Sequence, residues 1–569
     1  MAKLELNEDQ IKKVESFLQN RFHELSSMRE DFDDSIEEEI DIYNDVDKYI
    51  EEKADWEERI TVPYIYTIVQ TMVGRLDQAF FSDDNFVRVY SESDEFYNFE
   101  EELQNWLQDK LDCMRFKSRA RDFIEDSLVQ RTTWLQLKPV FTSGGKFRRV
   151  DFDILKWFDV WFDTTAVSVN DTDIFARKIV PFHDLSDKVY FNLDMVKETG
   201  FPEDTDSSRL QEEYQAKHGV SKLYDINPSG KVELLEWYGM YEVEEGKYEE
   251  VIFTMANRKV LIRAEKNVME TKQKRLFFPI RCLRQANSLI GKSVPQLVKK
   301  QQYELNEIRS LRMQNVKTQI KLLFKYKKDA GIDFDELFAK GGNAVGFEDN
   351  PDDVSTFDVP NMVQIASFIA SDLIQDMQQI TGAVDYLMGT SAARGMTETA
   401  SGIQTITEQA LFKFGMMAKN IADDIINFIT FVIVLYKKYD KSNILLKHPD
   451  FAPILEMSEE DIEDTLMFDI NIRDLTQRRD IERSQFINAT NVIAGLMAQT
   501  GGDLKELLRQ ILRTFKVRNI DKIMGEGAAQ QGPGMLAGPG NPGGGSRIAP
   551  NDQQAARPEE IAEEINPTL

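Results

Sequence analysis

One stretch of the chain constrains the fold more than any other, an apolar pattern that begins near residue 403 and continues to 435. Apolar residues recur there at spacings of three and four without slipping, at positions 403, 406, 410, 414, 417, 421, 425, 428, 432 and 435. This period predicts one amphipathic helix, which at ~1.5 Å per residue spans roughly 55–60 Å. A helix of this length is typical of an elongated or oligomeric architecture.

Length and charge narrow the classes of protein further. The 569 residues are too many for one ordinary core, so we expect several subdomains. The chain has 69 Lys and Arg against 98 Asp and Glu, a net charge of −29. Such an acidic chain repels phosphate backbones on average, which disfavours a sequence-specific DNA reader.

Targeting and redox signals are weak. The most apolar run, Ile425 to Tyr436, is shorter than the roughly twenty residues of a membrane span, so we expect a buried helix segment. The N-terminus is charged from residue 3 and shows no apolar signal-peptide core. Cys113 and Cys282 lie far apart in unlike contexts, which predicts neither a disulfide framework nor a zinc ribbon and fits a reducing cytoplasm.

The first 285 residues predict helices followed by strands. A helix is expected over 8–31, and the acidic stretch after it has apolar residues at helical spacing, so its charges are expected to form a solvated helix face. Pro63 is expected in the first turn of the next amphipathic helix. Period-two patterns predict a β-hairpin near 132–157 and further strands to about 265, interrupted by a polar helical insertion near 184–219. Together these segments predict a mixed α/β body over roughly 60–285.

Beyond residue 285 the pattern is helical. Ser293 and Gln296 have the spacing of a capping box at the start of a helix whose less apolar face is rich in Gln and Asn. A mixed segment over about 321–360 and a helix with an apolar stripe from Ile365 to Ile380 follow. Helices near 480–500 and 502–524 precede a Gly/Pro-rich tail, which cannot bury a core and ends in one short predicted helix.

No residue pattern points to catalysis, a metal or a cofactor. The four histidines, His23, His183, His218 and His448, are scattered and form no ligand motif. Gly291-Lys292-Ser293 resembles the end of a phosphate-binding loop, but Ala286 stands where the motif needs its first glycine. Paired carboxylates carry no information in so acidic a chain. We therefore expect a protein that is not an enzyme.

Several segments, in order, resemble the portal (head-to-tail connector) proteins of tailed bacteriophages, over about residues 55–520. They are "WEERITVPYIYTIVQTMVGRLDQAFF", "FDVWFDTTAVSVNDTDIFARKIV", "VELLEWYG", "KKQQYELNEIRSLRMQN" and "ITGAVDYLMGTSAARGMTETASGIQTITEQAL". The last is the most diagnostic: Thr381-Gly382, Gly389 and the Thr-rich helix start at 397–401 match the family's passage from a stem helix through a tunnel loop into a long helix.

The resemblance implies a mixed α+β portal fold that assembles as a dodecameric ring, with an α/β wing, a two-helix stem, a small α/β clip, a long kinked wing helix and a helical crown. Its implied boundaries are the wing at 1–285, the first stem helix at 286–320, the clip at 321–360, the second stem helix at 361–380, the tunnel loop at 381–397, the long wing helix and C-terminal part of the wing at 398–479, the crown at 480–525 and a flexible tail at 526–569.

The resemblance also implies two functional surfaces. The tunnel loop facing DNA contains Tyr386, Met388, Thr390, Ser391, Arg394 and Met396. The clip, as the interface for terminase and the adaptor, contains Lys325, Lys327, Lys328, Asp333, Phe334 and Phe338. Arg394 could touch phosphate transiently or pair with a neighbouring subunit's carboxylate, and the three lysines also suit an exposed helix C-terminus.

The implied function is a channel at the capsid vertex for packaging and ejection of the genome. The implied partners are further copies of the chain, the large terminase subunit, a head-completion adaptor, the major capsid and scaffolding proteins, and double-stranded DNA that passes non-specifically; no membrane is involved. The implied location is the virion, and the host cytoplasm during assembly. Two alternatives stay open: another ring-forming virion component, such as an adaptor, and an ATP-driven packaging enzyme, which the failed phosphate loop disfavours.

Overall fold

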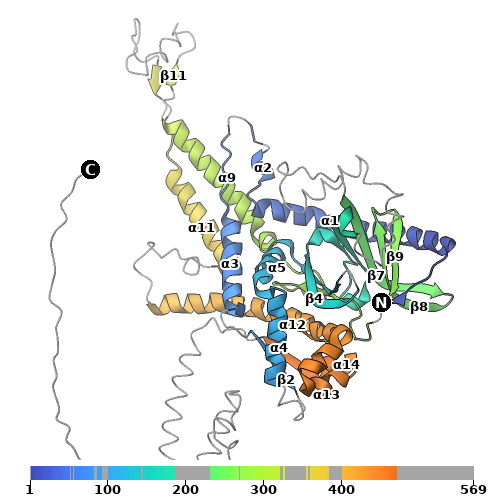
Figure 1. Cartoon of the computed structure of the whole chain (residues 1–569). Helices are drawn as coiled ribbons and strands as arrows, with labels where there is room; N and C mark the ends of the chain where they lie inside the picture. Colours follow the sequence, from blue (N-terminus) through green and yellow to red (C-terminus); the bar gives the residue numbers. More distant parts are fainter. Residues whose placement is uncertain are drawn as a thin grey trace, which may run out of the picture. The chain divides into compact units, whose positions relative to one another are not determined.

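The computed structural model describes residues 2–51, 53–54, 57–81, 86–91, 100–142, 145–185, 231–267, 269–320, 324–326, 354–356, 359–383 and 400–470 (Figure 1). The chain divides into two units, Met1–Arg479 and Asp480–Leu569, and all described residues belong to the first. The crown and the tail expected from the sequence lie outside the described residues.

Four antiparallel sheets are present among the described residues. The largest has six strands in the order β1-β9-β8-β7-β6-β5, and a second has three in the order β10-β3-β4. Two-stranded sheets pair β11 with β12 and β13 with β2. The strands are β1 (Ala2–Lys3), β2 (Val87–Ser91), β3 (Thr133–Phe141), β4 (Phe147–Leu155), β5 (Val160–Trp161), β6 (Ile174–Pro181), β7 (Lys231–Glu244), β8 (Lys247–Ala256), β9 (Val260–Lys266), β10 (Phe277–Ile280), β11 (Phe324–Tyr326), β12 (Val354–Thr356) and β13 (Leu466–Ile470).

The α-helices of the described part range from four residues to 48. They are α1 (Glu8–Tyr43), α2 (Lys48–Glu51), α3 (Tyr64–Phe81), α4 (Glu100–Cys113), α5 (Phe116–Gln130), α6 (Phe182–Leu185), α9 (Val294–Ile320), α11 (Val363–Thr381), α12 (Ala400–Lys447), α13 (Ala452–Glu456) and α14 (Glu459–Thr465). Short 3-10 turns occur at Trp157–Asp159, Val169–Asp171 and Pro449–Phe451.

The six-stranded sheet is covered on both faces. Helix α1 places Val14, Leu18, Phe22 and Leu25 on one face, where they form a buried cluster with residues such as Trp237 of β7. Residues of β7 on the alternate positions face the three-stranded sheet, since Gln136 Nε2 of β3 donates to Glu236 Oε2 at 3.2 Å. The period-two alternation of β7 therefore separates two different environments.

Helix α12 runs through the main apolar core. Phe428 lies in ring contact with Phe116 of α5, Phe152 of β4 and Phe278 of β10, at centroid distances of 5.3–5.6 Å. The apolar positions expected to face the core, from Phe414 to Leu435, are buried. The prediction of one long helix is confirmed, and the run from Ile425 to Tyr436 is a buried segment of it.

Several local predictions hold, and some boundaries shift. The expected hairpin is β3–β4, with a register shift between Val140 and Phe141. The helix expected over 8–31 continues to Tyr43, so the acidic stretch belongs to α1 itself. Pro63 directly precedes α3 rather than lying inside its first turn.

Candidate functional site: helices α9 and α11 and their supports

Helix α9 begins on a buried polar cluster. The Ser293 hydroxyl accepts a hydrogen bond from the backbone N–H of Gln296 at 3.0 Å, which caps the helix as the sequence predicts. The same hydroxyl donates to Glu39 Oε2 of α1 at 2.7 Å. The Gln296 side-chain oxygen is buried without a partner, so only half of the expected capping box forms.

Glu39 is the centre of this cluster. Its carboxylate, with 0% of the residue exposed, accepts hydrogen bonds from the Arg131 guanidinium (the Nε contact at 3.0 Å) and from Ser35 Oγ at 3.2 Å. A buried carboxylate of this kind needs hydrogen-bond donors for the lone pairs that the arginine leaves free. The hydroxyls of Ser35 and Ser293 supply these donors. The expectation of a solvated charge run is wrong at Glu39, because the acidic face turns inward there, while Glu30, Asp31, Asp34 and Glu37 are exposed.

The backbone of Arg131 has a rare conformation that this ion pair supports. Arg131 has φ 70° and ψ −49°, and the N–H of Thr132 donates to the Gln130 carbonyl at 2.8 Å, which is a γ-turn of positive φ. Such strain persists only where surrounding contacts fix it. Gly291 lies against this turn: a Cβ there would come within 2.5 Å of the Arg131 carbonyl oxygen.

These contacts explain the Gly-Lys-Ser sequence without a nucleotide. Gly291 allows the close backbone approach, and the Lys292 N–H donates to the Leu283 carbonyl at 2.8 Å. Ser293 faces a buried carboxylate, which would repel a phosphate. The rejection of a phosphate-binding loop agrees with this geometry.

The Gln/Asn-rich face of α9 is partly buried. Gln302, Asn306 and Ser310, four residues apart, lie beside the extended segment 57–63 and the start of α3. Their side-chain oxygens accept hydrogen bonds from the backbone N–H groups of Ile65 (3.3 Å), Val62 (3.0 Å) and Ile60 (3.2 Å), respectively. We call these three residues the polar ladder. It satisfies backbone donors that burial would otherwise leave unpaired.

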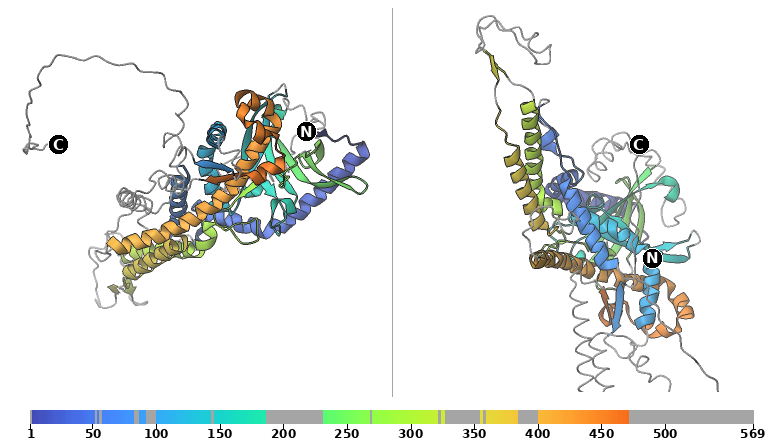
Figure 2. Two further views of the ribbon diagram at one scale, coloured as in Figure 1. Left: turned by 90° about the horizontal axis from the view of Figure 1, so that it is seen from below. Right: turned by 90° about the vertical axis from the view of Figure 1, so that its left-hand side faces the viewer.

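Helix α11 lies alongside α9, as Figure 1 and both views of Figure 2 show. Arg312 Nη1 of α9 donates to Ser367 Oγ at 3.1 Å, and Asn315 binds the Pro360 carbonyl at 3.2 Å. At the other end of α11, Gln378 Nε2 donates to the Tyr64 hydroxyl of α3 at 2.7 Å. The pair is therefore held to the rest of the unit through α3 as well as α1.

The apolar stripe expected on α11 is divided. Met377 is fully buried, but Ile365 is 58% exposed and Phe368 68% exposed. Helix α9 adds exposed apolar residues, among them Leu311 and Ile320, the latter 77% exposed. A group of exposed apolar side chains on neighbouring helices is typical of a protein–protein contact.

The charge of α11 has one sign. Asp372 and Asp376 are its charged residues, both exposed, and its sequence contains neither Lys nor Arg. The helix ends at Gly382, which has φ 80° and accepts no Cβ without strain. Lys413 of α12 donates to the carbonyl of Gln379 at 2.6 Å, so a cation caps this helix C-terminus.

Helix α12 is fixed to the segment after β10 by a second charged cluster. Asp424 accepts hydrogen bonds from Arg281 Nη2 at 3.1 Å and Arg284 Nη2 at 2.7 Å. Asn420 Nδ2 donates to the Cys282 carbonyl at 3.2 Å. Burial raises the pKa of Asp424, although the two guanidinium groups oppose the shift. Because the same segment leads into Ser293, α9 and α12 share one support.

The residues assigned to the two functional surfaces are not brought together by described structure. Lys325 lies in β11, where it pairs with Ser355 of β12. Lys327, Lys328, Asp333, Phe334 and Phe338 lie outside the described residues. So do the tunnel-loop residues Tyr386, Met388, Thr390, Ser391, Arg394 and Met396. Both surfaces remain predictions.

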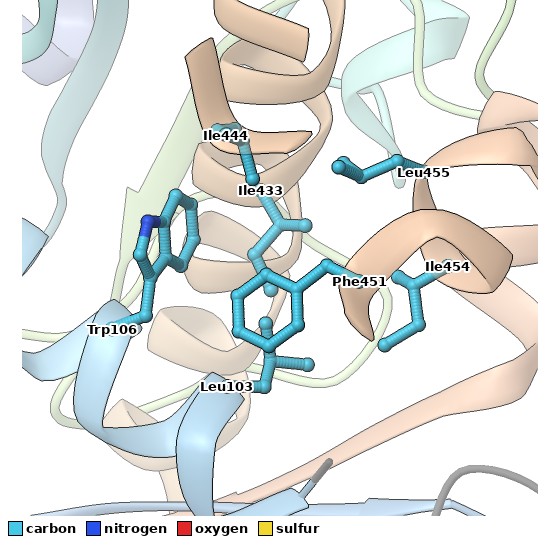
Figure 3. A pocket seen from close by; sticks show the side chains of 7 residues that line it. All are labelled: Leu103, Trp106, Ile433, Ile444, Phe451, Ile454 and Leu455. Atoms are coloured by element: carbon cyan, nitrogen blue, oxygen red, sulfur yellow. The ribbon is translucent and has the colours of Figure 1, made fainter. Parts of the chain in front are cut away.

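Other features of the described residues offer no chemical site. They contain no group of His, Cys, Asp and Glu that could hold a metal ion. Figure 3 shows a small pocket between α4, α12 and α13, and its lining is apolar: Leu103, Trp106, Ile433, Ile444, Phe451, Ile454 and Leu455. In this part of the chain, no helix has both the length and the apolarity to cross a membrane. Cys113 and Cys282 are both free thiols.

The sequence did not reveal the Glu39 cluster or the polar ladder as functional supports. The sequence does contain a pattern that could have indicated the polar ladder. Residues with hydrogen-bonding side chains recur at every fourth position of α9 and so share one face of the helix. No pattern in the sequence distinguishes Glu39, because seven further acidic residues surround it between 30 and 41.

The mixed helices and sheets fit a portal-type α+β fold. The family model of the phage SU10 portal protein matches residues 68–564, and the chain belongs to this phage portal protein family. Membership implies a structural protein of the virion, located at the capsid vertex as part of an oligomeric ring. Among curated proteins, none matches the chain.

Proposed function

We propose that twelve copies of this chain form a ring at the capsid vertex, through which double-stranded DNA enters during packaging and leaves during ejection. In this proposal the wing is 1–285, the stem is α9 and α11, the clip is 321–360, the tunnel loop is 381–397, the long wing helix lies within 398–479 and the crown is 480–525. The family match favours this role over that of an adaptor.

The exposed apolar side chains of α9 and α11 carry the proposal. A single chain leaves Phe368 and Ile320 largely in water, and burying apolar surface contributes about 25 cal/mol per Å². A neighbouring copy with the same pair supplies an apolar surface of matching chemistry. Contacts between different faces of identical subunits close into rings when the rotation permits.

The charge of α11 supports a channel that does not hold DNA. Each phosphate that a Lys or Arg neutralises adds to a salt-dependent binding affinity for DNA. A helix with Asp372 and Asp376 and no cation adds no such contact. Lining the bore with this helix would repel and centre the duplex, which suits translocation.

We assign the docking of terminase, and later of the head-completion adaptor, to the clip residues Lys325, Lys327, Lys328, Asp333, Phe334 and Phe338. Charge reversal at the three lysines should weaken terminase binding. Unchanged binding would indicate that these lysines only lie at an exposed helix C-terminus. We assign contact with moving DNA to the tunnel loop. Deleting 387–395 should leave rings intact but impair packaging or genome retention, and normal packaging would contradict this assignment.

The central experiment measures assembly. Purified chain should form cone-shaped rings with a central hole in negative-stain microscopy, and Phe368→Asp should shift the population to monomers by placing a charge in the contact. Tyr248→Asp, at another exposed aromatic residue, is the matched control and should assemble normally. Monomers of the unaltered chain under all salt conditions would refute the ring. Rings of Phe368→Asp equal to those of the control would refute this interface.

A further inference from the structure

The first 67 residues precede the range that matches the family model, yet their described part touches both the six-stranded sheet and helix α9. We call residues 2–67 the N-terminal arm. At one end β1 pairs with β9 at the edge of the sheet, and α1 buries Leu18 and Leu25 completely on its face. Arg29 donates to the Val160 carbonyl at 2.5 Å and lies over the rings of Trp157 and Trp161. The arm is thus anchored in the body of the unit.

From that anchor the arm follows α9 along most of its length. Glu39 binds the helix cap at Ser293 at 2.7 Å. Six and ten residues after Ser293 along α9, Lys299 and the Tyr303 hydroxyl donate to Glu38 at 2.5 Å and 2.9 Å. These acceptors are adjacent residues of α1, so the helix start is fixed by two charged contacts.

The polar ladder continues the contact toward the other end of α9. Gln302, Asn306 and Ser310 bind the backbone of the arm, and Asn306 Nδ2 also donates to Asp47 at 2.8 Å. Finally Lys317 pairs with Glu58 at 2.6 Å, in the last turn of the helix. From 293 to 317 the contacts span roughly 36 Å at ~1.5 Å per residue.

We propose that the N-terminal arm sets and holds the orientation of α9, and with it the α9/α11 pair, relative to the six-stranded sheet. The arm joins the sheet to α9 by both buried charge and backbone hydrogen bonds. Glu38, Glu39 and Asn306 act as positioning residues. The consequence for DNA passage rests on the proposed portal function, whereas the orientation of α9 does not.

The test uses the full-length chain kept monomeric by Phe368→Asp, with spin labels on cysteines at Arg309 and Tyr248, both exposed, after Cys113→Ser and Cys282→Ala. Asn306→Ala with Ser310→Ala removes two acceptors of the ladder. We expect the distance distribution between the labels to broaden, and amide exchange in α9 and in 57–63 to rise about ten-fold or more. The matched control is Glu304→Ala, an exposed residue of the same helix, which should change neither.

Two outcomes would overturn the proposal. One is an unchanged distance distribution in the ladder variant. The other is faster exchange in 57–63 with α9 as protected as in Glu304→Ala, because the helix would then be holding the arm and not the reverse. If Phe368→Asp does not yield monomers, the same comparison is made on whatever assembly forms. Packaging by the ladder variant is measured separately: normal packaging with a mobile α9 would refute its part in the portal function and leave the arm's structural role intact.

Discussion

Removing the charge of Glu39 is the most informative single perturbation of this unit. Its carboxylate faces Arg131, and the two side chains are 0% and 6% exposed. Glu39→Gln keeps the shape but leaves a buried guanidinium without its counter-ion and turns one acceptor into a donor. Breaking a buried pair in this way costs about 3–5 kcal/mol.

The free-energy cost of breaking the Glu39–Arg131 pair can be measured locally, by amide hydrogen exchange at the start of α9 and in α1 near residue 39. A global two-state unfolding analysis does not suit so large a chain. A cost of about 3–5 kcal/mol accelerates exchange through local opening by roughly a hundred-fold to several thousand-fold. Asp77→Asn, which breaks the surface pair with Arg121 (65% exposed), should cost at most about 1 kcal/mol.

A double variant separates the charge from the packing. Glu39→Leu with Arg131→Met removes both charges, and a buried pair replaced by apolar residues is often neutral in stability. We therefore expect the double variant to be better protected than Glu39→Gln. Exchange in Glu39→Gln within about three-fold of the unaltered chain, well below the range expected for a broken buried pair, would refute the reasoning.

Three further predictions concern the core. Burial raises the pKa of Cys282 to about 12, so at pH 8 a thiol reagent should modify exposed Cys113 and spare Cys282 until the chain unfolds; equal rates in peptide mass spectrometry would contradict this. Burial alone would raise the pKa of Glu236, but Lys178 and Arg263 hold it at about 2. Its contribution to stability is therefore present above pH 4.5 and lost as the pH falls toward 2, and Glu236→Gln should flatten the dependence of amide protection in β7 on pH in that window. Phe451→Ala should open a cavity beside Trp106 that costs about 3–5 kcal/mol locally, so amide exchange in α4 and α13 should rise by roughly a hundred-fold or more, and exchange equal to that of the unaltered chain would show that the core collapses around it.

Local periodicity predicted much of this fold. The long helix α12, the β3–β4 hairpin and the cap at Ser293 follow from side-chain spacing and turn residues close together in the sequence. These features depend on few neighbours, so a single sequence contains their causes. The family resemblance, which rested on the order of many segments, is confirmed by the match of the family model over residues 68–564.

The supports of α9 could not be predicted in the same way. Glu39 meets Arg131 across 92 positions of sequence and Ser293 across 254. Glu39 is buried because α1, the end of α5 and the start of α9 meet there. The local sequence around Glu39, a run of acidic residues, gives no information about that meeting. The residues assigned to the tunnel loop and to the clip stay predictions, because those assignments came from the resemblance and fall almost entirely outside the described residues.

The polar ladder makes the register between α9 and the arm discrete. Its acceptors repeat every four residues of α9, about 6 Å, while the donors are Ile60 and Val62 of the extended segment and Ile65 in the first turn of α3, at spacings of two and three residues. A displacement of one residue would therefore break all three backbone hydrogen bonds together. Under a force along its axis, α9 cannot slide along the arm in small steps. The hydrogen bonds of the polar ladder either keep their register or break together.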